Sequence, residues 1–195
     1  MRGIEHIPWL YQCVAAGMDA LGLARWREDL AQGARGRTLE IGCGTGRNFP
    51  LYPASAQVIG LDPDVAALKR AQRRAPHLPL LVGRAEALPF ADGSFDTVVS
   101  SLVFCSVSDP LRGLAEIRRV LRPDGELRML EHVRARRRFW AALQDRIQPV
   151  WTWVSGGCHP NRDIEVIVER SGFHIQTHSY RARHLLRLFA ARVRM

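Results

Sequence analysis

Short apolar runs alternate with longer amphipathic segments along residues 37–133. The apolar runs are typical of buried strands and lie at 37–42, 57–62, 78–82, 95–102 and 126–133. Helical spacing of apolar side chains predicts a helix with Pro63 at its start. A second helix is predicted to begin at Asp109-Pro110, a capping side chain followed by proline, with an apolar stripe of Leu111, Leu114, Ile117 and Leu121. This alternation predicts an α/β fold with a mostly parallel sheet.

The segments on either side of this core predict additional helices and strands in a single domain. Apolar spacing over 9–21 predicts a helix within an N-terminal cap of residues 1–36, and residues 134–160 form a less regular insertion. The C-terminal part, residues 161–195, is predicted to begin with a helix and to end in strands. We expect Asn161 to cap that helix, Gly172 to close it, and the last two strands to lie at 173–180 and near 187–194.

A glycine-rich segment, Glu40-Ile41-Gly42-Cys43-Gly44-Thr45-Gly46, follows the first predicted strand. Glycines there let the backbone turn sharply and let a ligand approach the main chain closely. Asp62 ends the second strand about 20 residues later, where a carboxylate can accept hydrogen bonds from both ribose hydroxyls. Arg47 stands where a dinucleotide fingerprint has its last small residue, which argues against an NAD site. The pattern predicts a nucleotide-type ligand at the carboxyl edge of the sheet.

Three further motifs, at residues 85–90, 92–96 and 121–125, complete a family pattern. Together with the glycine loop and Asp62 they resemble class I S-adenosylmethionine-dependent methyltransferases with a methyltransferase type 11 domain. The resemblance covers residues 37–133 in order and spacing. It implies a Rossmann-like fold, with a seven-stranded, mostly parallel sheet, an antiparallel last strand and helices on both faces. It also implies S-adenosyl-L-methionine as the cofactor and requires no metal.

The resemblance assigns roles to residues of the cofactor site. It implies that the glycine loop cradles the methionine end of the cofactor, that Glu40 holds its amino group and that Asp62 takes the ribose. Ala85 and Glu86 lie at the adenine, although Arg84 stands where many relatives have an aspartate for the adenine amino group. The full set implied is Glu40, Gly42, Cys43, Gly44, Gly46, Asp62, Pro63, Ala85, Glu86, Ser101 and Leu102.

A narrower resemblance reaches into the C-terminal part. The segments 101–107, 129–133, 148–151 and 157–162 look like the methyltransferase-like alkyl thiol methyltransferases and related bacterial small-molecule and phospholipid methyltransferases. This resemblance implies a small-molecule acceptor, and a thiol is the first candidate. A phospholipid or quinone N- or C-methyltransferase is the alternative, since it shares every cofactor motif. A nucleic-acid methyltransferase is a minority alternative, suggested by charge alone.

His132 follows the fifth predicted strand and is the first candidate for polarising the acceptor or taking its proton. A histidine hydrogen-bonded into its loop is the alternative interpretation, and His159 is the second catalytic candidate. Cys105 and Cys158 are candidate reactive thiols, but unpaired cysteines usually behave as small apolar groups. The four cysteines have no C-x-x-C spacing, so we predict neither a zinc site nor a redox motif. Four widely separated thiols favour a reducing, cytoplasmic setting.

The net charge of +9 is concentrated in the last third of the chain. Residues 1–131 carry 16 basic and 15 acidic side chains, whereas residues 132–195 carry 12 basic and 4 acidic ones. The basicity therefore belongs to the part that should cover the acceptor site, which favours an anionic acceptor, a thiolate or a lipid surface over nucleic acid.

Residues 134–154 allow two interpretations. Arginines at 134 and 136–138 precede Phe139 and Trp140, and apolar residues then recur at helical spacing with Pro149 interrupting them. One interpretation is a lid helix packed over the substrate pocket behind a solvated basic face. The other is an interfacial helix that lies on anionic lipid, in peripheral contact with a membrane.

Overall fold

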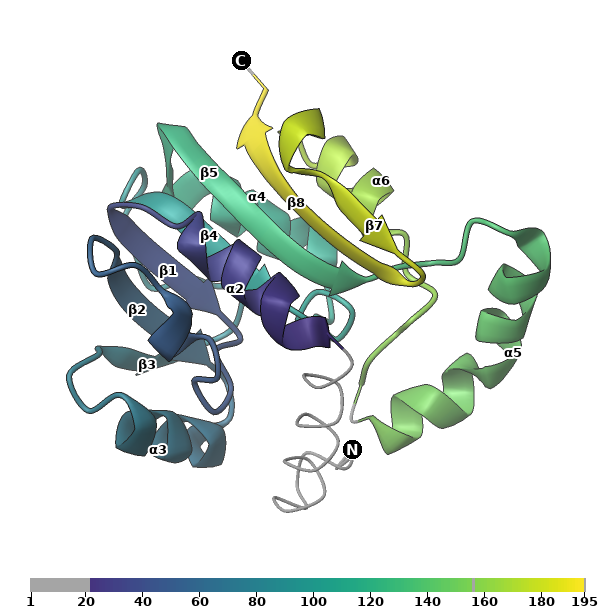
Figure 1. Ribbon diagram of the computed structural model, residues 1–195, viewed down its shortest axis with the longest axis horizontal. Helices are drawn as coiled ribbons and strands as arrows, with labels where there is room; N and C mark the ends of the chain where they lie inside the picture. Colours follow the sequence, from purple (N-terminus) through teal and green to yellow (C-terminus); the bar gives the residue numbers. More distant parts are fainter. Residues whose placement is uncertain (1–21, 156, 195) are drawn as a thin grey trace.

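The computed structural model describes residues 22–155 and 157–194 (Figure 1). The helix predicted at 9–21 lies outside these residues. The strands are β1 (Arg37–Ile41), β2 (Gln57–Asp62), β3 (Leu80–Val82), β4 (Phe95–Ser101), β5 (Leu121–His132), β6 (Phe173–Ile175), β7 (Arg181–Arg183) and β8 (Leu186–Val193). The helices are α2 (Ala24–Gln32), α3 (Val65–Arg74), α4 (Pro110–Val120), α5 (Arg138–Val154) and α6 (Ile164–Arg170), with short 3₁₀ turns η3 (Phe49–Leu51) and η4 (Thr177–Ser179).

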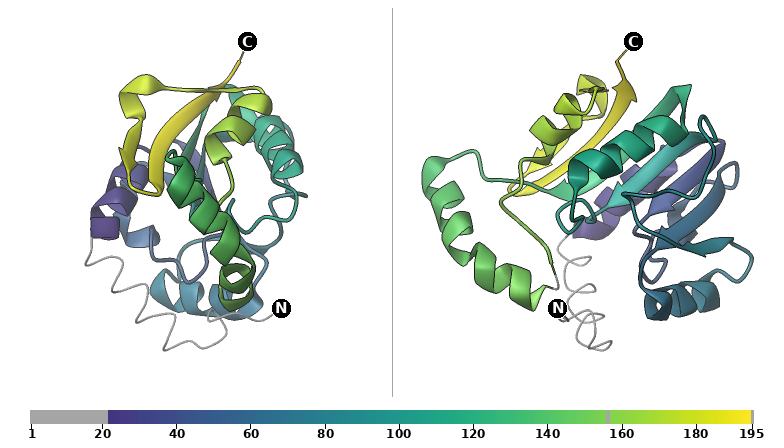
Figure 2. Two further views of the ribbon diagram at one scale, coloured as in Figure 1. Left: turned by 90° about the vertical axis from the view of Figure 1, so that its right-hand side faces the viewer. Right: turned by 180° about the vertical axis from the view of Figure 1, so that it is seen from behind.

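The strands form one sheet in the order β3-β2-β1-β4-β5-β8-β6, as the α/β prediction requires. The first five strands of this order are parallel, and β8 runs antiparallel between β5 and β6. The three-residue strand β7 was not predicted; it pairs with the start of β8 as an antiparallel addition to the seven expected strands. Helix α2 covers one face of the sheet, and α4 and α6 cover the other (Figures 1 and 2).

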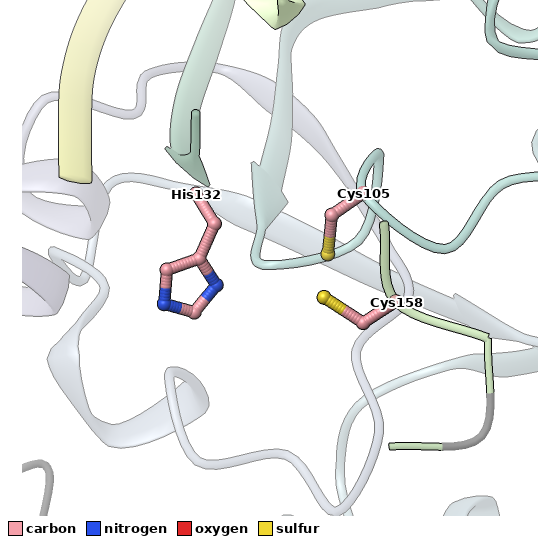
Figure 3. A group of neighbouring side chains, drawn as sticks. All are labelled: Cys105, His132 and Cys158. Carbon is pink, nitrogen blue, oxygen red and sulfur yellow. The ribbon is translucent and has the colours of Figure 1, made fainter. Parts of the chain in front are cut away.

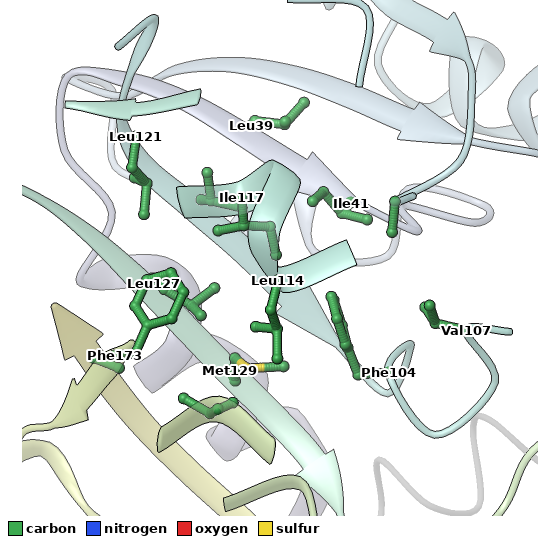
Figure 4. Close-up of a cluster of buried hydrophobic side chains, with 14 of the residues drawn as sticks. Leu39, Ile41, Phe104, Val107, Leu114, Ile117, Leu121, Leu127, Met129 and Phe173 are labelled. Carbon is green, nitrogen blue, oxygen red and sulfur yellow. The ribbon is translucent and has the colours of Figure 1, made fainter. Parts of the chain in front are cut away.

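The main core lies between the sheet and the helices α4 and α6 (Figure 4). Apolar side chains of β4 and β5, such as Phe95 and Met129, pack against Leu114 and Ile117 of α4, and all four are fully buried. Leu111, which we expected on the same stripe of α4, is 54% exposed in the first turn. This core fixes the positions of the central strands and therefore of the loops at their carboxyl ends.

Two helix starts differ from the prediction because nearby carboxylates take the capping role. Helix α3 begins at Val65, and Asp64 caps it by accepting a 2.8 Å hydrogen bond from the Ala66 amide, so Pro63 precedes the helix. Helix α6 is capped by Asp163, not by Asn161, whose side-chain amide donates to Asp145 of α5 at 2.9 Å. The predicted cap at Asp109-Pro110 and the closing Gly172, with φ +85°, are confirmed.

Helix α5 is the regular part of the predicted insertion. It continues through Pro149, where we expected an interruption, and it stands away from the sheet in Figure 1 and in the right-hand view of Figure 2. Solvent on the exposed face can satisfy the carbonyl that proline leaves without an N–H partner. Within the described residues, no helix is both long and apolar enough to cross a membrane.

Candidate active site

The carboxyl ends of β1, β2 and β4 meet at one edge of the sheet, where they border a cavity of about 300 Å³. In parallel sheets this edge is the usual place for a ligand, because the loops there leave a crevice between the strands. The residues of the predicted cofactor set that line the cavity are Glu40, Gly42, Cys43, Gly44, Asp62, Pro63, Ser101 and Leu102. The fold therefore brings eight of the eleven implied residues to one cavity.

A second cavity, of about 130 Å³, shares Gly42, Pro63, Val103 and Ser106 with the first. It is lined by the predicted adenine residues Ala85 and Glu86, together with the exposed Arg84. The two cavities are neighbours along the sheet edge, as an extended nucleoside ligand requires.

The carboxylate of Glu86 is already engaged by the protein. Its Oε1 accepts hydrogen bonds from the amides of Ser108 and Asp109 at 3.0 and 3.3 Å. This oxygen therefore holds the turn before α4.

The glycines of the loop serve different purposes. Gly42 has φ +64°, and a Cβ there would lie 2.4 Å from a methyl group of Val103. Gly44 has φ +53° and an open side, and its amide donates to Asp62 at 2.8 Å. Gly46 lies behind the loop and does not line the cavity; a Cβ there would lie 2.5 Å from the ring of Phe49.

Glu40 is buried at the bottom of the cavity with both carboxylate oxygens engaged. Asn48 donates to one oxygen at 2.8 Å and the Tyr52 hydroxyl donates to the other at 3.0 Å. Burial outweighs these hydrogen bonds and raises the pKa of Glu40 to about 7. Asn48 and Tyr52 were missed by the sequence analysis, since neither stands in a recognised motif.

Asp62 connects the glycine loop to the start of α3. One carboxylate oxygen accepts from the Gly44 amide and the other from the Asp64 amide, each at 2.8 Å. Burial raises the pKa of Asp62 despite these two bonds. The carboxylate is thus held in one orientation at the wall of the cavity.

Three buried polar atoms of the cavity have no hydrogen-bond partner among the residues that the structure describes. They are Thr45 Oγ1, Asn48 Oδ1 and Ser101 Oγ. Buried polar atoms are normally satisfied, so these atoms indicate a polar ligand group. The donor and acceptor set fits the amino-acid end of S-adenosylmethionine, and Asp62 fits its ribose.

The loop after β4, residues 102–107, is held in a strained and fixed conformation. Leu102 has φ +60°, which is unusual for a residue with a side chain, and its amide donates to Leu130 at 2.7 Å. The buried Glu131 accepts hydrogen bonds from the amides of Val103 and Phe104 at 3.0 and 3.1 Å. Glu131 was not among the predicted site residues, although it fixes the loop that borders the cavity.

Beside this loop the fold gathers Cys105, His132 and Cys158 (Figure 3). Their two sulfur atoms and a ring nitrogen all lie within 4.8 Å of one another; both cysteines are buried and His132 is half-buried. A hydrogen bond from Cys105 and the proximity of His132 lower the pKa of Cys158, while the same sulfur contact and burial raise that of Cys105. Because 27 and 26 residues separate them along the chain, no local spacing revealed this cluster.

His159, the second catalytic candidate, is not a member of the cluster. Its Nδ1 lies 2.8 Å from the carbonyl oxygen of Gly157, and its backbone amide donates to the Cys105 carbonyl at 2.8 Å. The structure thus places His159 where its backbone positions Cys105 and Cys158 relative to each other.

The chain was compared with known proteins. A family model described as a methyltransferase domain matches residues 39–129. Human thiol S-methyltransferase TMT1B is 38% identical over 151 residues, which cover 72% of this chain and 62% of that protein. The demethylmenaquinone methyltransferase of Renibacterium salmoninarum is 41% identical over 96 residues, 49% of this chain and 40% of that protein. The crystal structure of the YcgJ protein of Bacillus subtilis superposes with a TM-score of 0.71 at 18% identity, covering 91% of this chain and 98% of that one.

The alignments reach only part of the curated relatives. This chain spans about three-fifths of the length of the human thiol S-methyltransferase it matches. Residues 39–129, which the family model matches, include most of the residues that line the cofactor cavity.

Proposed function

We propose that this chain, which belongs to the class I S-adenosylmethionine-dependent methyltransferases, transfers the cofactor's methyl group to a small thiol. The observation that carries the proposal is the continuity of two sites along one loop. Leu102, Val103 and Ser106 line the cofactor cavity, and Cys105 of the same loop lies in the cluster with His132 and Cys158. The thiol S-methyltransferase among the relatives supports the same acceptor class.

The cofactor, when bound, supplies a methyl group on a positively charged sulfur, which is an activated leaving group. The protein's task is therefore to align the acceptor in line with that methyl and to exclude water. Asp62 and Glu40 anchor the ribose and the amino group, while the strained Leu102 loop forms the wall toward the acceptor.

On the acceptor side, His132 has the role of polarising the acceptor thiol or of taking its proton. A thiol with a reference pKa near 8.5 is partly ionised at neutral pH, so a modest stabilisation of the thiolate is enough. His132 is half-buried at the end of β5 and lies next to two sulfur atoms, an environment suited to a soft, polarisable acceptor.

A C-methyltransferase acting on a quinone is the second candidate. It is favoured by the similarity to the demethylmenaquinone methyltransferase, which extends over 49% of this chain. Because both candidates use the same cofactor residues, only the acceptor distinguishes them.

An acceptor screen with methyl-labelled S-adenosylmethionine tests the proposal. Small alkyl thiols and sulfide are compared with demethylated quinones, amines and phospholipids, and we expect label on the thiols. His132→Ala should lower turnover by about 10²-fold while the affinity for the demethylated cofactor changes by less than about twofold.

The matched control is His174→Ala, since His174 is exposed on β6, at the far end of the sheet order from β1. It should leave turnover unchanged. Label on quinones or lipids alone would contradict the thiol proposal, and unchanged turnover in His132→Ala would remove the role of His132.

We also propose that α5 makes peripheral contact with anionic membrane. Phe139, Val150 and Trp153 are 72%, 67% and 66% exposed on this helix. Arg137 and Arg138, at its N-terminus, make none of the ion pairs found among the described residues. Exposed aromatic residues next to unpaired arginines are typical of interfacial helices.

A further inference from the structure

The Cys105–His132–Cys158 cluster is built from three separate segments. Cys105 comes from the loop after β4, His132 from the end of β5, and Cys158 from the connection between α5 and α6. Their side chains point toward a common space (Figure 3), and their donor atoms lie within 4.8 Å of one another.

Hydrogen bonds outside the cluster hold these segments together. The His159 amide donates to the Cys105 carbonyl at 2.8 Å, and Thr152 Oγ1 of α5 donates to the Cys158 carbonyl at 2.9 Å. Arg162 donates to the carbonyls of Phe104 and Val107 at 2.6 and 2.7 Å, on either side of Cys105. The donor atoms are thus positioned by the fold without a covalent link between the sulfur atoms.

Two thiolates and one imidazole are a ligand set for zinc. Zinc lies about 2.3 Å from sulfur and about 2.0 Å from nitrogen in a tetrahedron, which puts its ligand atoms roughly 3.5–3.8 Å apart. Contraction of the cluster by about an ångström reaches this spacing. Three protein ligands with an open fourth position are the pattern of catalytic zinc sites, whereas structural sites have four.

We propose that Cys105, His132 and Cys158 bind a divalent cation of the zinc type, whose open fourth position holds the sulfur of the acceptor as a thiolate. The role of the acceptor rests on the proposed function; the binding of the cation does not. A disulfide between the two cysteines is the competing possibility, but it would leave the converging histidine without a role.

The location of the site fits this role. Leu102, Val103 and Ser106, which flank Cys105, line the cofactor cavity, so the cation lies on the acceptor side of the same loop. A divalent cation with two cysteine thiolates is electrically neutral. Binding of a third thiolate therefore brings the net charge of the site only to −1, so repulsion from the two cysteine thiolates does not prevent it.

The reaction at this site balances in two steps. The acceptor thiol R–SH replaces a metal-bound water, forms the metal–sulfur bond and releases its proton to solvent. The ring nitrogen of His132 then binds the cation, so His132 polarises the acceptor through the cation and does not take the proton itself. A lone pair of that sulfur then forms the bond to the methyl carbon as the carbon–sulfonium bond breaks, and its electron pair stays on the demethylated cofactor. The product is a neutral thioether, a weaker ligand that leaves the cation to water.

The cation is tested directly by metal analysis. The full chain is produced in zinc-containing medium under reducing conditions, passed through gel filtration and analysed by mass spectrometry for metals. We expect about one zinc per chain. Cys105→Ser, Cys158→Ser and His132→Ala should each weaken zinc binding by at least about 10-fold, whereas His174→Ala should retain it.

Folding of the variants is checked by calorimetric binding of the demethylated cofactor, which does not depend on the cluster. Cobalt(II) substituted for zinc gives a sulfur-to-metal absorption band, and an added small alkyl thiol should shift this band if it occupies the fourth position. The variants should lose the band while they still bind the demethylated cofactor.

The outcomes separate this proposal from the proposed function. A reduced chain that binds no zinc, or one with a Cys105–Cys158 disulfide and a mass lower by two hydrogens, overturns the metal site. Full thiol methylation by the metal-free chain overturns it as well and leaves the proposed function intact. A cobalt band that shifts with thiols in a chain that methylates no thiol supports the site and contradicts the proposed function.

Discussion

At the residue scale, the backbone of Gly42 is the narrowest constraint on the cofactor loop. Its φ of +64° disfavours any side chain, and a Cβ would lie 2.4 Å from Val103. We expect Gly42→Ala to destabilise the protein by at least about 2 kcal/mol and to weaken cofactor binding by about 10-fold or more. Urea denaturation and calorimetry with the demethylated cofactor measure the two effects.

Gly93→Ala is the matched control. Gly93 has a similar φ of +61°, but a Cβ there meets nothing within 4 Å, and it lies outside both cavities. The Gly93→Ala protein should be destabilised by only about 1 kcal/mol, and its affinity for the cofactor should be unchanged. Equal losses in the two variants would show that the contact with Val103 is unimportant.

Glu40 makes the stability of the chain depend on pH. Its pKa is raised from 4.5 to about 7, so the folded state binds this proton more tightly than the unfolded state does. Relative stability is therefore greatest below about pH 4.5 and falls as the pH rises to about 7, by up to about 3 kcal/mol. We expect wild type to lose stability relative to Glu40→Gln between pH 5 and about 8.

Glutamine is a suitable reference because it keeps the shape of the side chain and can still accept from Asn48. The measurement is urea denaturation without cofactor at several pH values. The difference in the free energy of unfolding between wild type and Glu40→Gln is then compared across these pH values. Parallel curves would mean that Glu40 is already ionised at pH 5.

At the element scale, α5 is the helix whose packing leaves the largest apolar surface. No described residue of α5 lines either cofactor cavity, while Thr152 of this helix donates to the Cys158 carbonyl at 2.9 Å, beside the cluster. Its inner side, with Trp140, Leu143 and Ile147, instead borders a separate cavity together with Leu185. The lid over the acceptor and the interfacial helix therefore both stay predictions, and the exposed apolar side chains of α5 make the interfacial role directly testable.

We expect the full chain to co-sediment with vesicles that contain anionic phosphatidylglycerol at low salt. Replacing Phe139 and Trp153 by serine should weaken this binding by about 10-fold, because each loses more than 100 Å² of apolar contact. Leu111→Ser, an exposed leucine on α4, is the control and should bind as wild type does. Failure of wild type to sediment with anionic vesicles would remove the membrane proposal.

At the scale of the whole molecule, part of the positive charge of the last third is used within the protein. Arg134 pairs with Asp145, Arg187 with Glu165 and Arg181 with Asp29, so several arginines of the last third connect elements of the fold. The basicity that we read as acceptor access is therefore only partly available to a ligand. The arginines of this part that are exposed and make none of the ion pairs found among the described residues are Arg137, Arg138, Arg146, Arg170 and Arg183.

Much of the cofactor site was predictable because its signals are local. The glycine loop, Asp62 and the strands that carry them are short-range patterns, and the two strands end within one residue of the predicted positions. The partners of Glu40 were not predictable. Asn48 and Tyr52 reach it only because η3 folds back against the loop, and neither residue type indicates such a contact by its spacing.

The sequence by itself determined the parallel sheet and the glycine loop, since periodicity and turn residues act over a few positions of the chain, and its local motifs carried the resemblance to the methyltransferases. Only the tertiary structure decided that Cys105, His132 and Cys158 share one space, and that Asp163 and not Asn161 caps α6. These arrangements depend on segments far apart in the chain, brought together by sheet order and by hydrogen bonds such as those of Arg162. Long-range packing therefore decided which side chains meet beside the cofactor cavity.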